Sequence, residues 1–259
     1  MTHSETLFQP PSPPPAICIA RASLSYEGSF LFKDLSLELP AGRMSVLLGP
    51  SGVGKSSLLR LIAGLEAVEG GGSVEFAING GPVPDSGAPA YMAQHDLLLP
   101  WLDALGNVTL GQRLRREPPD RARARGLLAR VGLENYTHAR PAALSGGMRQ
   151  RVALARTLME ERPAVLMDEP FSALDAITRL RLQERAAELL RGRTILLVTH
   201  DPMEALRLGE HIFIMSGRPA RLSEVPPPAG KTPRDPADEG FLGHHAELLR
   251  RLGAAEAGL

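Results

Sequence analysis

The segment from Gly49 to Ser56 constrains the fold of this chain more than any other feature. It reads Gly-Pro-Ser-Gly-Val-Gly-Lys-Ser, which matches the pattern G-x-x-x-x-G-K-[S/T]. An apolar run at 44–49 precedes it and a helical pattern at 56–66 follows it, so we expect a strand, a phosphate-binding loop and a helix in that order. A glycine-rich turn that serves only packing is the alternative interpretation.

The chemistry of this loop predicts a site for a nucleoside triphosphate. Its glycines allow backbone N–H groups to point at phosphate oxygens, and the start of the helix adds a partial positive charge. Lys55 can reach the outer phosphates, and the Ser56 hydroxyl can ligate Mg²⁺. The residues expected to bind the nucleotide are Gly49, Pro50, Ser51, Gly52, Val53, Gly54, Lys55, Ser56 and Ser57.

Two acidic residues, Asp168 and Glu169, end the apolar run at 164–167. Asp168 can reach the Mg²⁺ shell, while Glu169 can stand beside an attacking water as general base. Unpaired carboxylates at the end of a buried strand are costly unless a cation lies near them. A GTPase would be expected to carry an Asn-Lys-x-Asp motif, which this sequence lacks.

Short apolar runs alternate with helical segments, which predicts an α/β fold with a mostly parallel sheet covered on both faces. Together with the phosphate-binding loop, this pattern predicts a P-loop NTPase (RecA-like) core. Two strand patterns around a turn at Glu27–Gly28 predict an N-terminal antiparallel β subdomain, and a helical stretch predicts an inserted helical subdomain over about 96–162. The expected strands are 17–26, 31–40, 44–49, 73–78, 88–94, 164–169 and 194–200, and a further helix is expected at 178–191.

The 259 residues correspond to roughly 1.7 times a domain of about 150 residues, which suits one large domain with an insertion. Prolines concentrate near both ends, so we expect a flexible arm at 1–15, a compact domain at 16–225 and a tail at 226–259. Within the tail, 237–252 could form one amphipathic helix. Its apolar face would consist of Phe241, Leu242, Leu248, Leu249 and Leu252.

Charge and cysteine content restrict the function classes. The 29 basic residues balance the 29 acidic ones, so nucleic acid is not expected as a ligand, and the arginine-rich stretch 113–130 lacks the aromatic residues that stack on bases. Cys18 is the single cysteine, which excludes an intramolecular disulfide and suits a reducing compartment. No apolar run is long enough to span a bilayer and no signal peptide is evident, so a cytoplasmic location is expected.

A third motif, Leu-Ser-Gly-Gly-Met-Arg-Gln-Arg at 144–151, opens a helix that is expected to run to about Glu161. Ser145 and the two glycines form a second anion site, because they cap a helix N-terminus. The string resembles the signature of ATP-binding cassette (ABC) ATPases. The order of the other pieces is similar to that family over residues 16–225: Tyr26, the phosphate loop, Gln94, the signature, Asp168-Glu169, Asp175 and His200.

This resemblance implies that two cassettes pair head to tail and hold ATP between the phosphate loop of one and the signature of the other. Tyr26 would stack on adenine, Gln94 would contact Mg²⁺ and water and sense a membrane partner, and Asp175 would couple the two sites. His200 would contact the γ-phosphate and orient it against Glu169. The implied catalytic residues are Glu169, His200, Gln94 and Lys55, and the implied Mg²⁺ ligands are Ser56, Gln94 and Asp168. The signature residues that would act on the partner's nucleotide are Leu144, Ser145, Gly146, Gly147, Met148, Arg149 and Gln150.

The segment Leu98-Leu99-Pro100-Trp101 after Gln94 resembles the loop at this place in the ATPase subunits of bacterial importers for nitrate, sulfonates, taurine and thiamine precursors. The stretches 91–115 and 166–183 look most like those of the ATPase subunits assigned to the uptake of hydroxymethylpyrimidine, a thiamine precursor. The resemblance therefore implies an ATP-hydrolysing importer subunit on the cytoplasmic face of a membrane, with a second cassette, permease subunits and, indirectly, a substrate-binding protein. A nitrate, sulfonate or taurine importer, an exporter subunit and a soluble non-transport ABC ATPase are the alternatives.

Overall fold

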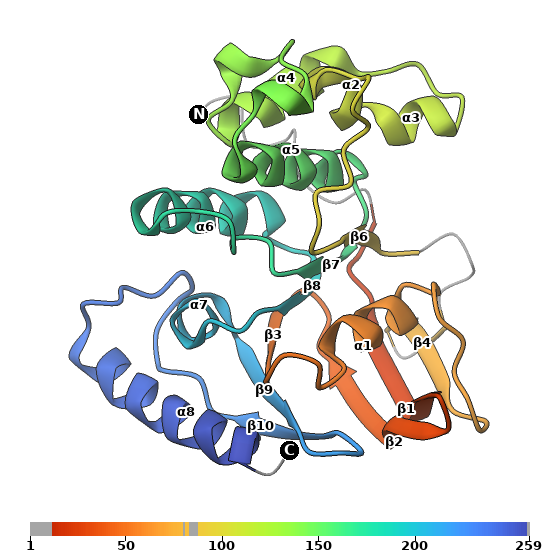
Figure 1. The fold of residues 1–259 in the computed structure, drawn as a ribbon, viewed down its shortest axis with the longest axis vertical. Coiled ribbons are helices and arrows are strands. Elements are labelled where there is room, and N and C mark those ends of the chain that lie inside the picture. Colours follow the sequence, from red (N-terminus) through yellow and green to blue (C-terminus); the bar gives the residue numbers. More distant parts are fainter. Residues whose placement is uncertain (1–11, 80, 83–87, 258–259) are drawn as a thin grey trace.

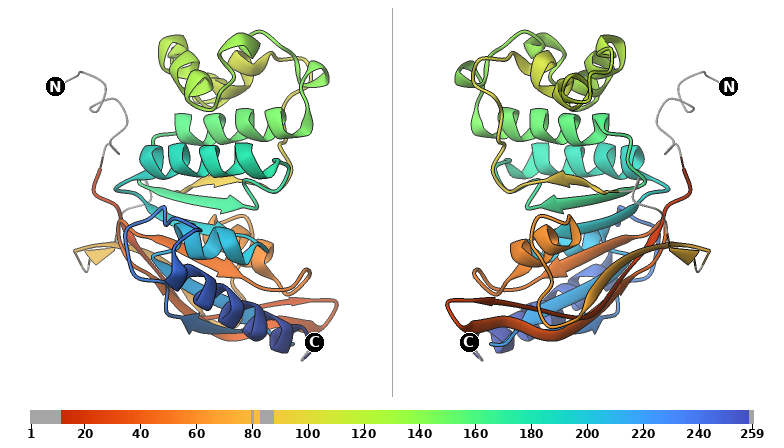
Figure 2. Two further views of the ribbon diagram at one scale, coloured as in Figure 1. Left: turned by 90° about the vertical axis from the view of Figure 1, so that its left-hand side faces the viewer. Right: turned by 90° about the vertical axis from the view of Figure 1, so that its right-hand side faces the viewer.

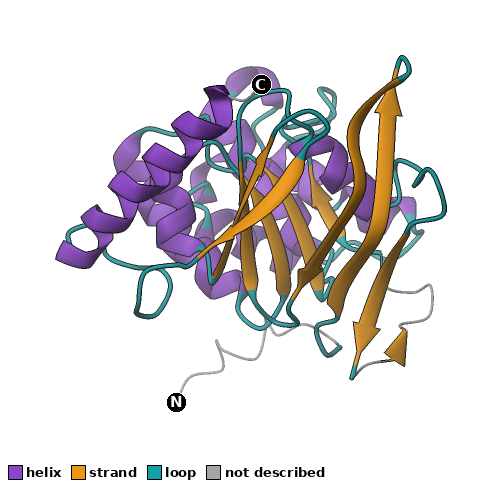
Figure 3. Cartoon of the chain, turned by 90° about the horizontal axis from the view of Figure 1, so that it is seen from below, coloured by secondary structure: helices purple, strands orange, loops and turns teal. Residues whose placement is uncertain are grey.

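The computed structural model describes residues 12–79, 81–82 and 88–257 and contains two sheets that lie side by side (Figure 3). The smaller sheet is antiparallel, with strands in the order β2 (Ser29–Leu39), β1 (Ala16–Tyr26), β4 (Ser73–Ile78) and β5 (Gly81–Pro82). The larger sheet has the order β10 (Arg221–Val225), β9 (His211–Ser216), β3 (Met44–Leu48), β8 (Thr194–Val198), β7 (Ala164–Asp168) and β6 (Ala90–Met92).

Parallel pairing runs from β9 through β3, β8 and β7 to β6, and only the edge strand β10 is antiparallel to its neighbour. Every residue of β3, β7 and β8 is buried. Both faces of a parallel sheet are covered, which explains why these strands are continuous apolar runs in the sequence.

Two apolar cores lie on the two faces of this larger sheet. Leu47 of β3 faces a core shared with α1 (Lys55–Ile62) and the antiparallel sheet, so α1 is held between the two sheets. Its neighbours Val46 and Leu48 face the opposite core, as the period of two in a strand requires. That second core contains residues of α5 (Gly146–Met159), α6 (Ala176–Leu190), α7 (Pro202–Leu208) and α8 (Glu239–Ala257).

A helical lobe is stacked above α6 and the larger sheet at one end of the molecule (Figures 1 and 2). It contains α2 (Ala104–Val108), α3 (Leu110–Leu114), α4 (Arg121–Arg130) and α5, with short 3-10 turns at Glu134–Tyr136 and Pro141–Ala143. Asp103, Asp120 and Ser145 cap α2, α4 and α5 by accepting backbone N–H groups. None of the helices in the described ranges is long and apolar enough to cross a membrane.

The predicted α/β P-loop fold is confirmed, and most expected elements are present with shifted ends. The strand expected at 88–94 shortens to three residues, and the helical stretch at 101–161 divides into the lobe helices and turns. The elements α7, β9 and β10 were not predicted. The arm expected at 1–15 lies mostly outside the described residues.

The region after 225 packs against the larger sheet. The Arg234 guanidinium donates to the backbone oxygens of Leu206 and Gly209, at 2.7 and 2.8 Å. The helix expected at 237–252 is α8, which runs to Ala257. Phe241 and Leu248 of its expected apolar face enter the core, and Leu252 packs against it. The remaining two, Leu242 and Leu249, are exposed, so this part of the expected face was wrong.

Candidate functional site

The candidate site lies where the parallel strands end. The loop 49–54 follows β3, Asp168 ends β7 with Glu169 next in the chain, and His200 comes shortly after β8. Gln94 follows β6. The carboxyl ends of parallel strands meet at one edge of a sheet, which is where α/β proteins bind their ligands.

Two glycines of the phosphate loop are required by close backbone contacts. A Cβ at Gly49, where φ is 157°, would lie 2.4 Å from the carbonyl oxygen of Met215. At Gly54, where φ is 115°, a Cβ would lie 2.9 Å from Leu31. Both positions exclude a side chain, so the glycines shape the loop against β9 and β2.

Lys55, the first residue of α1, is buried at this loop. Its Nζ donates to the backbone oxygens of Gly49 and Pro50, at 2.7 and 2.9 Å. Burial lowers the pKa of Lys55, and the carboxylates of Glu169 and Asp168 oppose that shift. An ammonium group has three protons, so one donor of Lys55 is left for a phosphate oxygen.

Asp168 is 3% exposed and is hydrogen-bonded to the Ser56 side chain. Burial raises the pKa of Asp168, while the bond from Ser56 and the charge of Lys55 lower it. The carboxylate and hydroxyl oxygens are hard ligands of the kind that Mg²⁺ prefers. Ser56 and Asp168 therefore fit a Mg²⁺ site beside the phosphate loop.

Glu169 lies at the centre of a second group of contacts. Its Oε1 is 3.0 Å from Nδ1 of His200, and its Oε2 accepts a long bond of 3.4 Å from Nε2 of Gln94. The Glu169 side chain is 15% exposed, whereas that of His200 is 59% exposed and open to a ligand. The structure thus brings together Glu169, His200 and Gln94, three of the four residues that the resemblance implies for catalysis.

The signature residues at the start of α5 divide into an outer and an inner set. Ser145 caps the helix by accepting from Met148 N at 3.3 Å, and both Ser145 and Gly146 are exposed. Leu144 and Gln150, which were expected to act on the partner's nucleotide with them, are buried. This part of the prediction needs correction, because a buried side chain cannot meet a ligand of another chain. Gly147, Met148 and Arg149 are half-buried.

Two further predicted residues, Tyr26 and Asp175, make contacts outside this group. The Tyr26 ring at the end of β1 is 48% exposed, and its hydroxyl is hydrogen-bonded to Arg60. Asp175 caps α6 by accepting from Thr178 N at 3.0 Å, and this bond holds the pKa of the exposed Asp175 carboxyl below its usual value. The helices α1 and α5 face opposite cores, so the phosphate loop and the signature lie on opposite faces of the larger sheet.

Comparison with known proteins decides the family. Residues 32–172, more than half of the chain, match the family described as ABC transporter. The chain belongs to the ABC transporter family. It is therefore an ATP-binding cassette and an ATPase.

Individual relatives support this assignment. The cassette is 40% identical to the aliphatic sulfonates import ATP-binding protein SsuB 2 of Pseudomonas syringae pv. tomato, over 90% of this chain and 96% of that protein. It is 44% identical to the taurine import ATP-binding protein TauB of Pseudomonas aeruginosa, over 74% of each. It also resembles the dimeric post-hydrolysis structure of the cassette MJ0796 bound to ADP and Pi, with a TM-score of 0.70, 28% identity and coverage of 85% of this chain and 99% of that one.

The loop after Gln94 is held by residues that the sequence analysis missed. Asn107 is fully buried; its Oδ1 accepts from Leu99 N at 2.8 Å, and its Nδ2 donates to the backbone oxygens of Leu99, Leu102 and Asp103. From α5, Arg156 donates to the backbone oxygens of Asp96 and Leu97. The loop is therefore a rigid platform, and it carries two exposed apolar side chains, Leu97 (63%) and Trp101 (66%).

The cassette also buries a carboxyl group, that of Glu204, which was not predicted from the sequence. Glu204 of α7 accepts from Nε2 of Gln183 at 3.3 Å and from the Thr199 hydroxyl. Burial raises the pKa of Glu204 from 4.5 to about 7. In sequence, a glutamate one turn into a helix capped by Asp201 is indistinguishable from a solvated one.

This shift predicts a pH dependence of stability. Between about pH 4.5 and pH 7 the folded chain keeps a proton that the unfolded chain releases, so the free energy of unfolding falls as pH rises through that window. Glu204→Gln removes this titration, so its stability relative to the wild type should rise by up to about 3 kcal/mol from pH 4.5 to pH 7. Urea unfolding of both proteins across this range measures the difference. A constant difference would show that Glu204 titrates normally.

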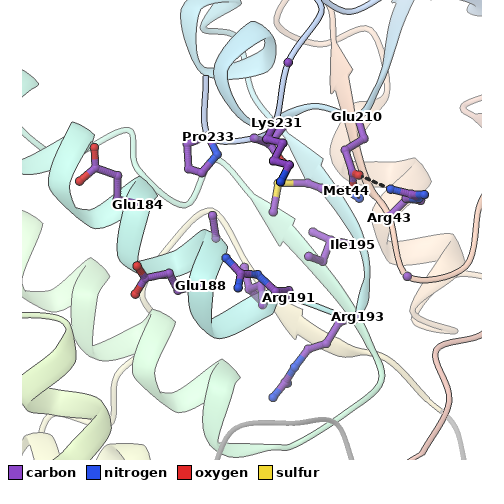
Figure 4. A pocket seen from close by; sticks show the side chains of 16 residues that line it. Arg43, Met44, Glu184, Glu188, Arg191, Arg193, Ile195, Glu210, Lys231 and Pro233 are labelled. Carbon is purple, nitrogen blue, oxygen red and sulfur yellow. Dashed lines mark hydrogen bonds and ion pairs between the residues drawn. The ribbon is translucent and has the colours of Figure 1, made fainter. Parts of the chain in front are cut away.

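A cavity of about 760 Å³ lies at the amino-terminal ends of the parallel strands, opposite the candidate site (Figure 4). It is lined by Met44, the first residue of β3, by Ile195, the second residue of β8, and by Lys231 and Pro233 of the C-terminal region. Arg43 and Glu210 form an ion pair of 2.7 Å at its rim. Because the phosphate loop and Glu169 follow the opposite ends of the strands, this cavity is not part of the nucleotide site.

Proposed function

We propose that this ATPase powers the import of small sulfonates, of the aliphatic sulfonate or taurine class, through a membrane permease. The permease partner is inferred from the rigid loop after Gln94. This loop begins beside Glu169 and carries the exposed side chains of Leu97 and Trp101. The names of the relatives SsuB and TauB support the substrate class. Neither name supports the hydroxymethylpyrimidine reading, so we do not retain it.

In the proposed reaction Glu169 accepts a proton from the water that attacks the γ-phosphorus of ATP, as a general base does. Its contact with Nδ1 of His200 fixes the carboxylate and leaves the exposed edge of the imidazole for the γ-phosphate. Lys55 offers its third proton to a phosphate oxygen. Ser56 and Asp168, together with Gln94 next to Glu169, would hold Mg²⁺, which supplies charge neutralisation on the phosphates when bound.

Two chains would complete each site. The exposed signature residues Ser145 and Gly146 would cover the nucleotide on the phosphate loop of a second copy, and Asp175 would link the two sites. The separation of the two anion sites on opposite faces of the larger sheet supports this arrangement. The cassette would comprise 16–225, with the inserted lobe at about 96–162.

The coupling surface can be separated from the chemistry by a double substitution, Leu97→Ala with Trp101→Ala. Because both side chains are mostly exposed, the variant should fold, and its basal ATP hydrolysis should stay within about threefold of wild type. With the permease in nanodiscs and the substrate-binding protein loaded with an alkanesulfonate or taurine, stimulation of hydrolysis should fall by roughly tenfold or more, as expected for loss of an interface anchor.

Leu242→Ala with Leu249→Ala is the matched control, since both leucines are exposed on α8. Normal stimulation of the Leu97/Trp101 variant would remove this loop from the permease contact. Stimulation of the wild-type complex by hydroxymethylpyrimidine or nitrate, but by no sulfonate, would overturn the substrate class.

A further inference from the structure

The Gln150 side chain points inward from the second turn of α5 and is 5% exposed. Its Nε2 donates to the backbone oxygen of Glu169 at 2.7 Å and to Oγ of Ser172 at 3.2 Å. Its Oε1 accepts from the backbone N–H of Ala173 at 2.9 Å. One residue of the signature motif therefore holds the loop that follows β7 at three points.

The backbone of Glu169 needs such support. Its φ is 48°, in the left-handed region that residues other than glycine seldom occupy, and such a conformation persists only where surrounding contacts fix it. The N–H of Glu169 donates to Val198 O at the end of β8, at 2.8 Å. Its carbonyl oxygen accepts from Ser172 in the same loop and from Gln150 in a different element. The peptide groups on both sides of Glu169 are thus anchored.

The start of α5 also packs directly on this loop. A Cβ at Gly147 would lie 2.9 Å from Cδ2 of Leu174 and 3.0 Å from Ala173 O. A displacement of α5 therefore moves both the surface that faces the loop and the amide that holds Glu169.

We propose that Gln150 is a positioning residue for Glu169, which ties the signature helix to the general base of its own chain. The proposal rests on the proposed role of Glu169. The outer residues of the signature would meet the partner's nucleotide, while Gln150 on the inner side sets the backbone that aims Glu169 at His200. Nucleotide binding at one site would thereby affect the position of the general base Glu169 at the other site.

Gln150→Met tests this, because methionine keeps the length of the side chain and removes its three hydrogen bonds. We expect kcat for ATP hydrolysis to fall about 10- to 100-fold, the range for a misplaced catalytic group, with KM for ATP within about threefold because the phosphate loop is untouched. Gln150→Glu keeps an acceptor for Ala173 N but loses the donor to Glu169 O, so it should show the same split between kcat and KM. Gln150→Glu replaces Gln150→Met as the test if the methionine variant does not fold.

Thr157→Val is the matched control on the same helix. Thr157 is buried, and its Oγ1 donates to Ala153 O at 3.0 Å, so this variant loses a hydrogen bond of α5 away from Glu169. Its kcat should stay within about twofold of wild type, as for a substitution that does not touch the reacting groups. An equal fall in kcat for Thr157→Val would show that general loosening of α5 is responsible and would overturn the proposal.

A double variant distinguishes positioning from a separate role. In the Glu169→Gln background, Gln150→Met should change the residual single-turnover rate by less than about twofold, since both residues act through one group. Losses that multiply would overturn the proposal, as would an unchanged kcat in folded Gln150→Met. If Glu169→Gln itself hydrolyses ATP normally, the role of Glu169 fails instead.

Discussion

Replacing Glu169 with glutamine should slow ATP hydrolysis by about 10²- to 10⁴-fold, the range for loss of a positioned general base. Glutamine keeps the shape of the side chain and can still accept from His200 Nδ1, but its amide cannot take a proton from water. ATP affinity should stay near normal, because Lys55 and the loop at 49–54 are untouched. Phosphate release under saturating MgATP and equilibrium binding of ATP measure the two quantities separately.

Glu188→Gln is the matched control, since Glu188 is an exposed glutamate of α6 that lines the cavity at the opposite edge of the sheet. It should hydrolyse ATP at the wild-type rate. Unchanged turnover in Glu169→Gln would remove Glu169 from the mechanism and leave His200 and Asp168 as the remaining candidates at the end of the sheet.

The fold could be predicted to the extent that burial imposes a pattern on the sequence. The strands β3, β7 and β8 are covered on both faces and stand out as apolar runs. The edge strand β10 does not, because only Val225 of its residues is buried. The helix α7 has seven residues, too few for a clear apolar period, although its cap Asp201 and the following proline are a start signal.

The residues of the candidate site could be predicted from the sequence, but the directions in which their side chains point could not. Lys55, Asp168, Glu169 and His200 are fixed by the ends of buried strands, so the topology brings them together. The direction of a side chain within a motif depends on tertiary contacts. Gln150 is adjacent to exposed signature residues in sequence, yet its amide finds partners only where α5 meets the loop after β7.

The same limit applies to the loop after Gln94. Its length and apolar residues are visible in the sequence, but its rigidity comes from the buried amide of Asn107 and from Arg156, which is separated from it by most of the helical lobe. Hydrogen bonds between distant segments leave no periodic pattern. They can be identified only from the structure.

The second large effect concerns assembly. Because Glu169→Gln should bind ATP without consuming it, MgATP should hold two copies of this variant together through the phosphate loop of each and the signature of the other. Gly146 offers a way to block that contact without disturbing the monomer. It is exposed, and apart from its chain neighbours and the backbone of α5, the nearest atom to a Cβ there would be Arg149 Nη2, at 3.9 Å. A glutamate at this first turn of α5 suits the helix dipole but would repel a phosphate group.

Sedimentation velocity of Glu169→Gln at tens of micromolar, with and without saturating MgATP, tests the central claim that two chains share each nucleotide. We expect a monomer without nucleotide and a dimer with it. Adding Gly146→Glu should restore the monomer, whereas adding Gly126→Glu, at an open and exposed position of α4, should not. A Glu169→Gln protein that binds ATP and yet stays monomeric at saturation would show that two chains do not share each nucleotide.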